Sequence, residues 1–218
     1  MACISKKESG EQYGFKAVPE SLDEITAEWC EAALKKGNAI NSDIKISSIE
    51  VKRLQNEITG VMDGGGFSGS TLLRVNLQYD GNVTGNEPSS LVAKLSLGSG
   101  FRPGIFWRLF MYAQVGGLDE YMARQEICFI RNVIPVMETS EYAHPKIYFS
   151  GIDDKGDRGF LTAVILDKPS KVKTIVLMED MNGWKSSAPG EFETKEKAAL
   201  CFKNVSILHA KYWGDNEK

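Results

Sequence analysis

The chain has 218 residues, of which 42% are hydrophobic and 25% are charged, as in ordinary folded domains. This composition excludes a collagen-like, coiled-coil or wholly disordered chain. The 26 basic and 29 acidic residues leave a net charge of −3, which gives no general attraction for nucleic acid or an anionic membrane. No segment approaches the ~20 apolar residues of a membrane-spanning helix, and the first residues lack the apolar core of a secretory signal. We therefore expect a cytoplasmic protein whose four scattered cysteines (Cys3, Cys30, Cys128 and Cys201) are reduced.

The first half of the chain is predicted to form one helix and three strands. Apolar residues of 20–36 fall on one helical face, Ser21 and Glu24 form a capping-box pattern, and Gly37 ends the helix. Three segments then alternate between apolar and polar residues, as strands do: 46–54, 71–79 and 90–97. Because no helical segment separates these strands, we expect them to be antiparallel.

The second half is predicted to contain two helices and two or three strands. Residues 101–117 are aromatic and irregular, whereas 118–133 and 192–212 have helical periodicity. Strands are expected at 144–151 and 174–178, with an additional strand and a loop in 160–173. The predicted fold class is α+β, with an antiparallel sheet of about five strands and a helix inserted after the third strand.

Two clusters of side chains have ordinary explanations. The carboxylates of Asp153, Asp154 and Asp157 (DDKGD) are interpreted as a solvated hairpin turn rather than a metal site. The aromatic residues of 101–112 are interleaved with arginines, as on a surface that stacks single-stranded nucleic acid, but the density of basic residues is low. Packing of these aromatic residues against the sheet or against a further lobe is the favoured interpretation.

A glycine-rich segment, Gly64 to Thr71 (GGGFSGST), separates two predicted strands. It is not a P-loop, because Ser70 stands where that motif requires lysine. It is not a dinucleotide fingerprint either, because a strand rather than a helix follows Gly69. Glycines between two antiparallel strands are typical of the loop that covers nucleotide phosphates in kinases. The alternative is a glycine-rich hairpin that binds no ligand.

Two charged residues lie in apolar patterns and are expected to pair. Lys94 is in the middle of a predicted strand, and Glu126 lies among apolar residues of a predicted helix. A buried ammonium and a buried carboxylate each need a partner. A strand lysine paired with a helix glutamate, and reaching nucleotide phosphates, is the arrangement of kinase-type phosphotransferases. The alternative is a lysine that extends to solvent and a solvated glutamate.

Taken in order, six segments resemble one enzyme superfamily: PESLDEITAEW, GGGFSGSTLLRVNLQYDG, SSLVAKL, ARQEICFI, LMEDM and LHAKYW. They are similar to the N-terminal lobe and hinge of the aminoglycoside phosphotransferase and choline kinase-like superfamily, close to its ecdysteroid kinase-like branch. The resemblance spans residues 18–214. It implies a flexible N-terminus (1–17), a protein-kinase-like lobe and hinge (18–181) and the first helix of a truncated helical lobe (182–218). Residues 161–172 are longer than this family usually has before the hinge strand.

The resemblance also implies roles for individual residues. The loop over the phosphates of ATP would consist of Gly64, Gly65, Gly66, Phe67, Ser68, Gly69 and Ser70. Lys94 would bind phosphate, and Glu126 would be its helix partner. Met178 would flank the adenine, and backbone groups of Glu179 and Met181 would bond its edge. The family's His-x-Asp catalytic loop and the aspartate that binds Mg²⁺ have no counterpart in the sequence.

The expected function is that of the ATP-binding part of a phosphotransferase. The whole enzyme would transfer the γ-phosphate of ATP to a hydroxyl or amine of a small molecule, with the acceptor and Mg²⁺ held by the second lobe. Neither nucleic acid nor a membrane is expected as a partner. Neither His144 nor His209 is placed as a general base in the sequence. The alternatives are a non-catalytic module that binds a nucleotide or a protein partner, and an incomplete gene product.

Overall fold

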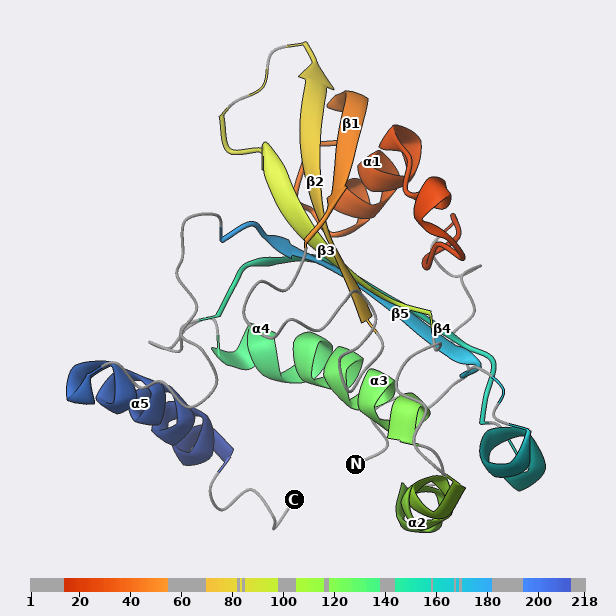
Figure 1. Ribbon diagram of the computed structural model, residues 1–218. Coiled ribbons are helices and arrows are strands. Elements are labelled where there is room, and N and C mark those ends of the chain that lie inside the picture. Colours follow the sequence, from red (N-terminus) through yellow and green to blue (C-terminus); the bar gives the residue numbers. More distant parts are fainter. Residues whose placement is uncertain are drawn as a thin grey trace.

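The computed structural model describes residues 14–54, 70–81, 83, 85–97, 105–115, 118–137, 144–157, 159–166, 168, 170–181 and 194–212. Within these residues the chain forms an antiparallel sheet of five strands in the order β1-β2-β3-β5-β4 (Figure 1). The strands are β1 (Lys45–Arg53), β2 (Ser70–Asp80), β3 (Ser90–Ser96), β4 (Ile147–Asp154) and β5 (Val172–Glu179). The prediction of an α+β fold with about five antiparallel strands is confirmed.

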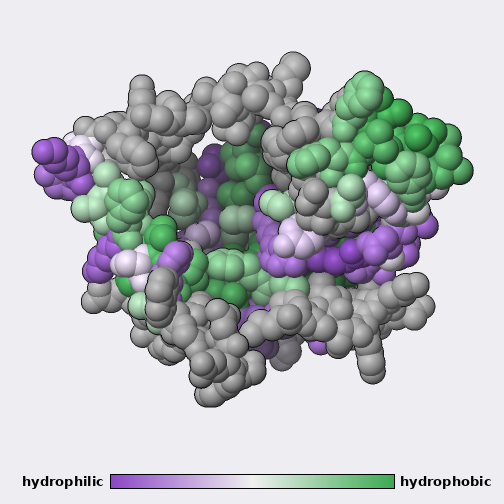
Figure 2. Space-filling model, turned by 90° about the horizontal axis from the view of Figure 1, so that it is seen from below, coloured by the Kyte–Doolittle hydropathy of each residue, from purple (hydrophilic) through white to green (hydrophobic). Residues whose placement is uncertain are grey.

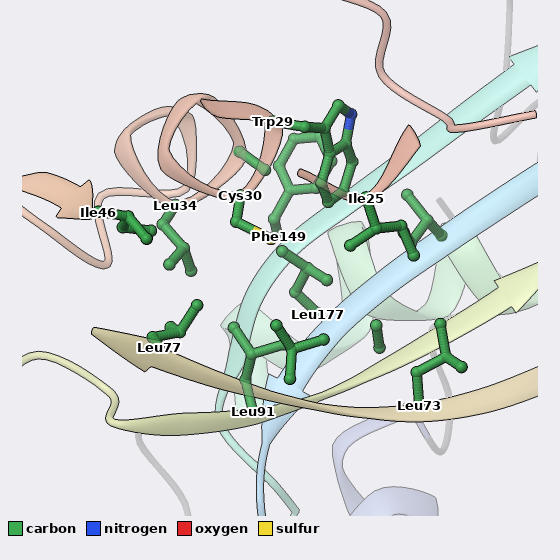
Figure 3. Close-up of a cluster of buried hydrophobic side chains, with 14 of the residues drawn as sticks. Ile25, Trp29, Cys30, Leu34, Ile46, Leu73, Leu77, Leu91, Phe149 and Leu177 are labelled. Carbon is green, nitrogen blue, oxygen red and sulfur yellow. The ribbon is translucent and has the colours of Figure 1, made fainter. Parts of the chain in front are cut away.

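One face of the sheet carries the main hydrophobic core, and we call it the α1 face because helix α1 (Ala27–Lys36) covers it. Alternate side chains of β2, β3 and β5 point to this face, since successive residues of a strand face opposite sides. Figure 3 shows Leu73, Leu91 and Leu177 converging beneath Trp29 and Leu34 of the helix. All three leucines of the strands are fully buried, so this core fixes the register of the sheet.

The opposite face, here the α3 face, is covered chiefly under β4 and β5. Helix α3 (Leu118–Cys128) lies below these strands and continues through a π-helical turn, η3 (Phe129–Val133), into α4 (Ile134–Met137) (Figure 1). Its buried residues Ala123 and Ile127 pack against Ile152, Val172 and Val176. The helix inserted after the third strand is confirmed, and it extends beyond the predicted end at residue 133.

The first helix begins later than its capping-box pattern predicts. Ser21 makes no side-chain cap and precedes only a short 3-10 turn, η2 (Leu22–Glu24). The Glu24 carboxylate instead accepts hydrogen bonds from the Glu20 amide and the Lys16 ammonium. Helix α1 is capped by Thr26, whose hydroxyl accepts from the amide of Trp29 at 3.2 Å. The predicted end of the helix at Gly37 is confirmed.

Two predictions for the second half of the chain are wrong. Residues 105–115 form a helix, α2 (Ile105–Val115), where the sequence indicated an irregular segment. The predicted strand within 160–173 is a π-helical turn, η4 (Leu161–Ile165). The two elements meet through the rings of Tyr112 and Phe160, whose centroids are 5.6 Å apart. The predicted last helix is present as α5 (Lys195–Tyr212).

Phe106 and Phe110 of α2 remain largely exposed, and packing of these rings against a further lobe, the other expectation, stays a prediction. Phe106 is 86% exposed and Phe110 is 54% exposed. The neighbouring element η4 also has exposed apolar residues, among them Leu161, and in Figure 2 a hydrophobic patch stands out at the right of the lower surface. Of the other aromatic residues of the predicted cluster, Tyr112 packs against Phe160, Phe101 lies outside the described residues, and the side chain of Trp107 is not described.

Candidate functional site

The ion pair between Lys94 and Glu126 is the centre of the candidate site. The Lys94 ammonium donates to the Glu126 carboxylate with an Nζ to Oε1 distance of 2.6 Å. The two side chains are 25% and 32% exposed, so both reach the edge of the solvent. The predicted pairing is confirmed, and the alternative of a lysine and a glutamate that are solvated independently is wrong.

The register of the sheet explains why Lys94 faces the helix. Lys94 lies opposite Leu72 of β2 and Val176 of β5, on the α3 face. Its neighbours Ala93 and Leu95 point into the core on the α1 face. Because successive side chains of a strand point to opposite faces, the Lys94 side chain points to the α3 face. The helix covers the α3 face chiefly under β4 and β5. The pair therefore lies at the boundary between this covered part and the part of the face beneath β2 and β3.

Helix α3 is anchored to β4 by a second ion pair, which the sequence analysis missed. Arg124 donates to both oxygens of Asp154 at 2.8 Å and to Asp157 at 2.6 Å. Hydrogen bonding to Asp154 is the main cause of the raised pKa of Arg124. The interpretation of DDKGD as a solvated turn is wrong for Asp154, which ends β4 and whose side chain is only 7% exposed. This anchor fixes the helix two residues before Glu126.

An apolar strip continues from the ion pair along the α3 face. Val92 of β3 lies opposite Met178 of β5, one row from Lys94, and Leu72 lies directly opposite Lys94. All three apolar side chains are only partly buried, in contrast to the closed core on the α1 face. Figure 2 shows that the lower surface of the molecule is hollowed, with hydrophobic and hydrophilic residues around the hollow. Met178 was predicted; Leu72 and Val92 were missed, although alternation places them on the same face as Lys94.

The last residue of β5, Glu179, and the residues that follow it lie at the far end of this strip. The Glu179 amide donates to the carbonyl of Lys146 at 2.8 Å, so the backbone group that Glu179 could offer to a ligand is its carbonyl oxygen. Asp180 is held by side chains of β2 and β3, Arg74 and Ser90. Ser90 is four residues from Lys94, or about 13 Å along the strand at a rise of ~3.3 Å per residue. The strip thus runs from a basic group at one end to a hydrogen-bonding segment at the other.

The predicted loop over the phosphates cannot be placed. Gly64, Gly65, Gly66, Phe67, Ser68 and Gly69 lie outside the described residues. Ser70 is the first residue of β2 and pairs with Ser96 at the end of β3. Because β1 and β2 are antiparallel partners, the segment that joins them leaves and re-enters the sheet at the end of β2 that lies next to Lys94.

Other kinds of site find little support in the described part of the chain. Those residues contain no group of three or more His, Cys, Asp or Glu side chains that could hold a metal ion. None of the described helices combines the length and apolar character needed to cross a bilayer. His144 contacts the carbonyl of Pro145 at 2.9 Å, and His209 is exposed on α5. Cys30, Cys128 and Cys201 are not joined by a disulfide, and burial raises the pKa of Cys30 to about 12.

Comparison with known proteins gives no further guide. No family model matches the chain, and no significant match is found among curated proteins or solved structures.

Proposed function

We propose that this chain binds ATP and forms the nucleotide-binding lobe of a small-molecule phosphotransferase of the aminoglycoside phosphotransferase and choline kinase-like type. The observation that carries the proposal is the 2.6 Å pair between Lys94 on the third strand and Glu126 on α3, the second helix after that strand. In protein kinases a lysine of the third strand, held by a glutamate of the next helix, contacts the nucleotide phosphates. The strip of Leu72, Val92 and Met178 beside the pair supports the same assignment.

Each part of the candidate site suits one part of a nucleotide. An ammonium group has three N–H donors, so Lys94 can donate to Glu126 and still donate to phosphate oxygens. Glu126 limits the rotation of the flexible lysine side chain and so lowers the entropic cost of binding. The partly exposed apolar side chains offer contact area to a planar base. Backbone groups of Glu179 and Met181 would give the base its orientation.

The proposal includes no step that depends on Mg²⁺. When bound, the metal would neutralise phosphate charge during transfer. The described residues do not fit such an ion, because they include no cluster of carboxylates that could hold it. The described residues support binding and orientation of the nucleotide; the γ-phosphate transfer to an alcohol or amine follows from the resemblance alone.

Binding measurements with single variants test the proposal. The Lys94→Ala variant should lose about tenfold or more in affinity for ATP but keep its affinity for adenosine, because only the phosphates meet the lysine. Glu126→Gln should weaken ATP binding less, since the carboxylate acts only through Lys94. Lys52→Ala is the matched control, because Lys52 is an exposed lysine of β1. An unmodified chain that binds no ATP, or an unchanged affinity in Lys94→Ala, would refute the proposal.

A turnover assay separates this proposal from a non-catalytic nucleotide-binding module. Both predict that Lys94→Ala lowers ATP affinity. Only a phosphotransferase consumes ATP when the protein, as isolated from its source, is supplied with alcohols and amines.

A further inference from the structure

Asp180, the residue after β5, has a nearly buried carboxylate that side chains of two other strands hold in place. Its side chain is 6% exposed and accepts hydrogen bonds from Arg74 at 2.8 and 3.2 Å and from the Ser90 hydroxyl at 2.5 Å. The two bonds from the guanidinium group form a bidentate pair, which constrains orientation as well as distance. Asp180 follows β5 directly, so these bonds tie the segment after β5 to β2 and β3.

The residues on either side of Asp180 are Glu179 and Met181, whose backbone groups are the candidates for binding the base. Each peptide unit is planar, so a residue has only two soft backbone dihedrals. Fixing Asp180 through its side chain therefore restricts both adjoining peptide units. Glu179 is also held from the other side, by a hydrogen bond from its amide to Lys146 and by one from the Lys146 amide to its carboxylate at 3.1 Å. The Glu179 carbonyl oxygen consequently has a fixed direction.

We propose that Asp180, held by Arg74 and Ser90, is a positioning residue that makes the site select adenine over purines that lack a 6-amino group. This inference rests on the proposed function. Adenine carries an amino donor at C6, whereas hypoxanthine and guanine carry a carbonyl acceptor there. A fixed carbonyl of Glu179 accepts a hydrogen bond from the amino group of adenine. Opposite hypoxanthine or guanine, the same oxygen meets the carbonyl at C6, which is also an acceptor. A buried acceptor left unpaired is costly, and a segment that cannot rotate cannot avoid that cost.

The experiment compares the affinities of ATP, ITP and inorganic tripolyphosphate for the full chain. ITP differs from ATP only in the group at C6 and N1 protonation, and tripolyphosphate tests the Lys94 end alone. The unmodified chain should prefer ATP over ITP by about tenfold or more. In Asp180→Ala and Arg74→Ala this preference should fall below about threefold, with tripolyphosphate affinity unchanged. Asp80→Ala, an exposed aspartate at the end of β2, is the matched control.

A merely structural role would lower the stability of Asp180→Ala without altering the ratio of the two affinities. If that variant does not fold, Ser90→Ala removes one donor and no charge, and an intermediate preference is expected. An unmodified chain that binds ATP and ITP equally would overturn the inference, as would folded variants that keep the full preference. In either case the proposed function survives, because ATP still binds. Absence of any ATP binding by the unmodified chain would overturn both.

Discussion

Replacing Asp154 by alanine should destabilise the protein far more than the same change at Asp157, although Arg124 binds both carboxylates. The bond to Asp157 is the shorter, at 2.6 Å against 2.8 Å. Burial separates the two: the Asp154 side chain is 7% exposed and that of Asp157 is 66% exposed. Solvent screens the exposed pair and competes for its hydrogen bonds, so distance is the wrong guide to strength here.

The expected magnitudes follow from the bonds that each change removes. Asp154→Ala removes two hydrogen bonds from the guanidinium group, each contributing about 1.5–3 kcal/mol, and a third from the Gly156 amide. Relief of the desolvation of the buried carboxylate offsets part of that loss, which leaves a cost of about 2–4 kcal/mol. Asp157→Ala removes one exposed pair, at a cost of about 0.2–1 kcal/mol.

Urea unfolding of the two variants and the unmodified chain checks this prediction. The free energy of unfolding should fall in the stated order with the denaturant slope unchanged. In 1 M salt, where the screening length is about 3 Å, the small cost of Asp157→Ala should vanish while most of that of Asp154→Ala remains. Equal costs for the two variants would contradict the reasoning. A cost below about 0.5 kcal/mol for Asp154→Ala would support the interpretation from the sequence, in which this carboxylate belongs to a solvated turn.

Two further predictions concern the packing and the pH dependence of α1. A Cβ atom on Gly37 would lie 1.6 Å from the carbonyl oxygen of Tyr148, so Gly37→Ala must push the helix end away from β4 and should cost about 3 kcal/mol in thermal or urea unfolding. Gly159→Ala, where the added atom meets open space, is the control and should change stability by less than about 0.5 kcal/mol. Hydrogen bonds from Lys35 and from a backbone amide of β1 lower the pKa of Glu31 below its ordinary 4.5. The stability that Glu31 contributes is therefore present above pH 4.5 and lost as the pH falls through the lowered value. Glu31→Gln should be less stable than the unmodified chain at pH 7, with a difference that shrinks below pH 4; a difference that grows on acidification would contradict the assignment.

The strands and the central ion pair could be predicted because their signals are local. Alternation over a few residues defined β2 and β3, and a single charge in an apolar pattern marked both Lys94 and Glu126. Helix α2 lacked such a signal, because its apolar residues occupy several faces and two of its phenylalanines remain exposed. The start of α1 was ambiguous for a related reason, since Ser21 and Thr26 are both good N-caps and only tertiary contacts of the preceding segment decide between them.

The contacts of Asp180 could not be predicted from the sequence. Its partners Arg74 and Ser90 are separated from it by 106 and 90 residues. These contacts form because β5 pairs with β3 as well as with β4, its neighbour in the sequence. They also depend on a register in which Val92 lies opposite Met178. A pattern along one strand contains neither fact. Once the register is known, Arg74 falls on the α3 face two residues from Leu72, and its partner is found at the end of the next strand but one.

Three ion pairs on the α3 face differ in a way that bears on function. In two of them a bidentate arginine closes off a carboxylate that is nearly buried: Asp154 is 7% exposed and Asp180 is 6% exposed. Such pairs join elements of the fold and have little capacity for a further partner. In the third, Lys94 and Glu126 are 25% and 32% exposed, and the lysine ammonium has donors beyond the one that Glu126 accepts. Arg124 already holds α3 against the sheet through Asp154, so the Lys94–Glu126 pair is not needed for that task. Under the proposed function, the accessible pair meets the nucleotide phosphates, and the two closed pairs fix the helix and the segment after β5 on either side of the ligand.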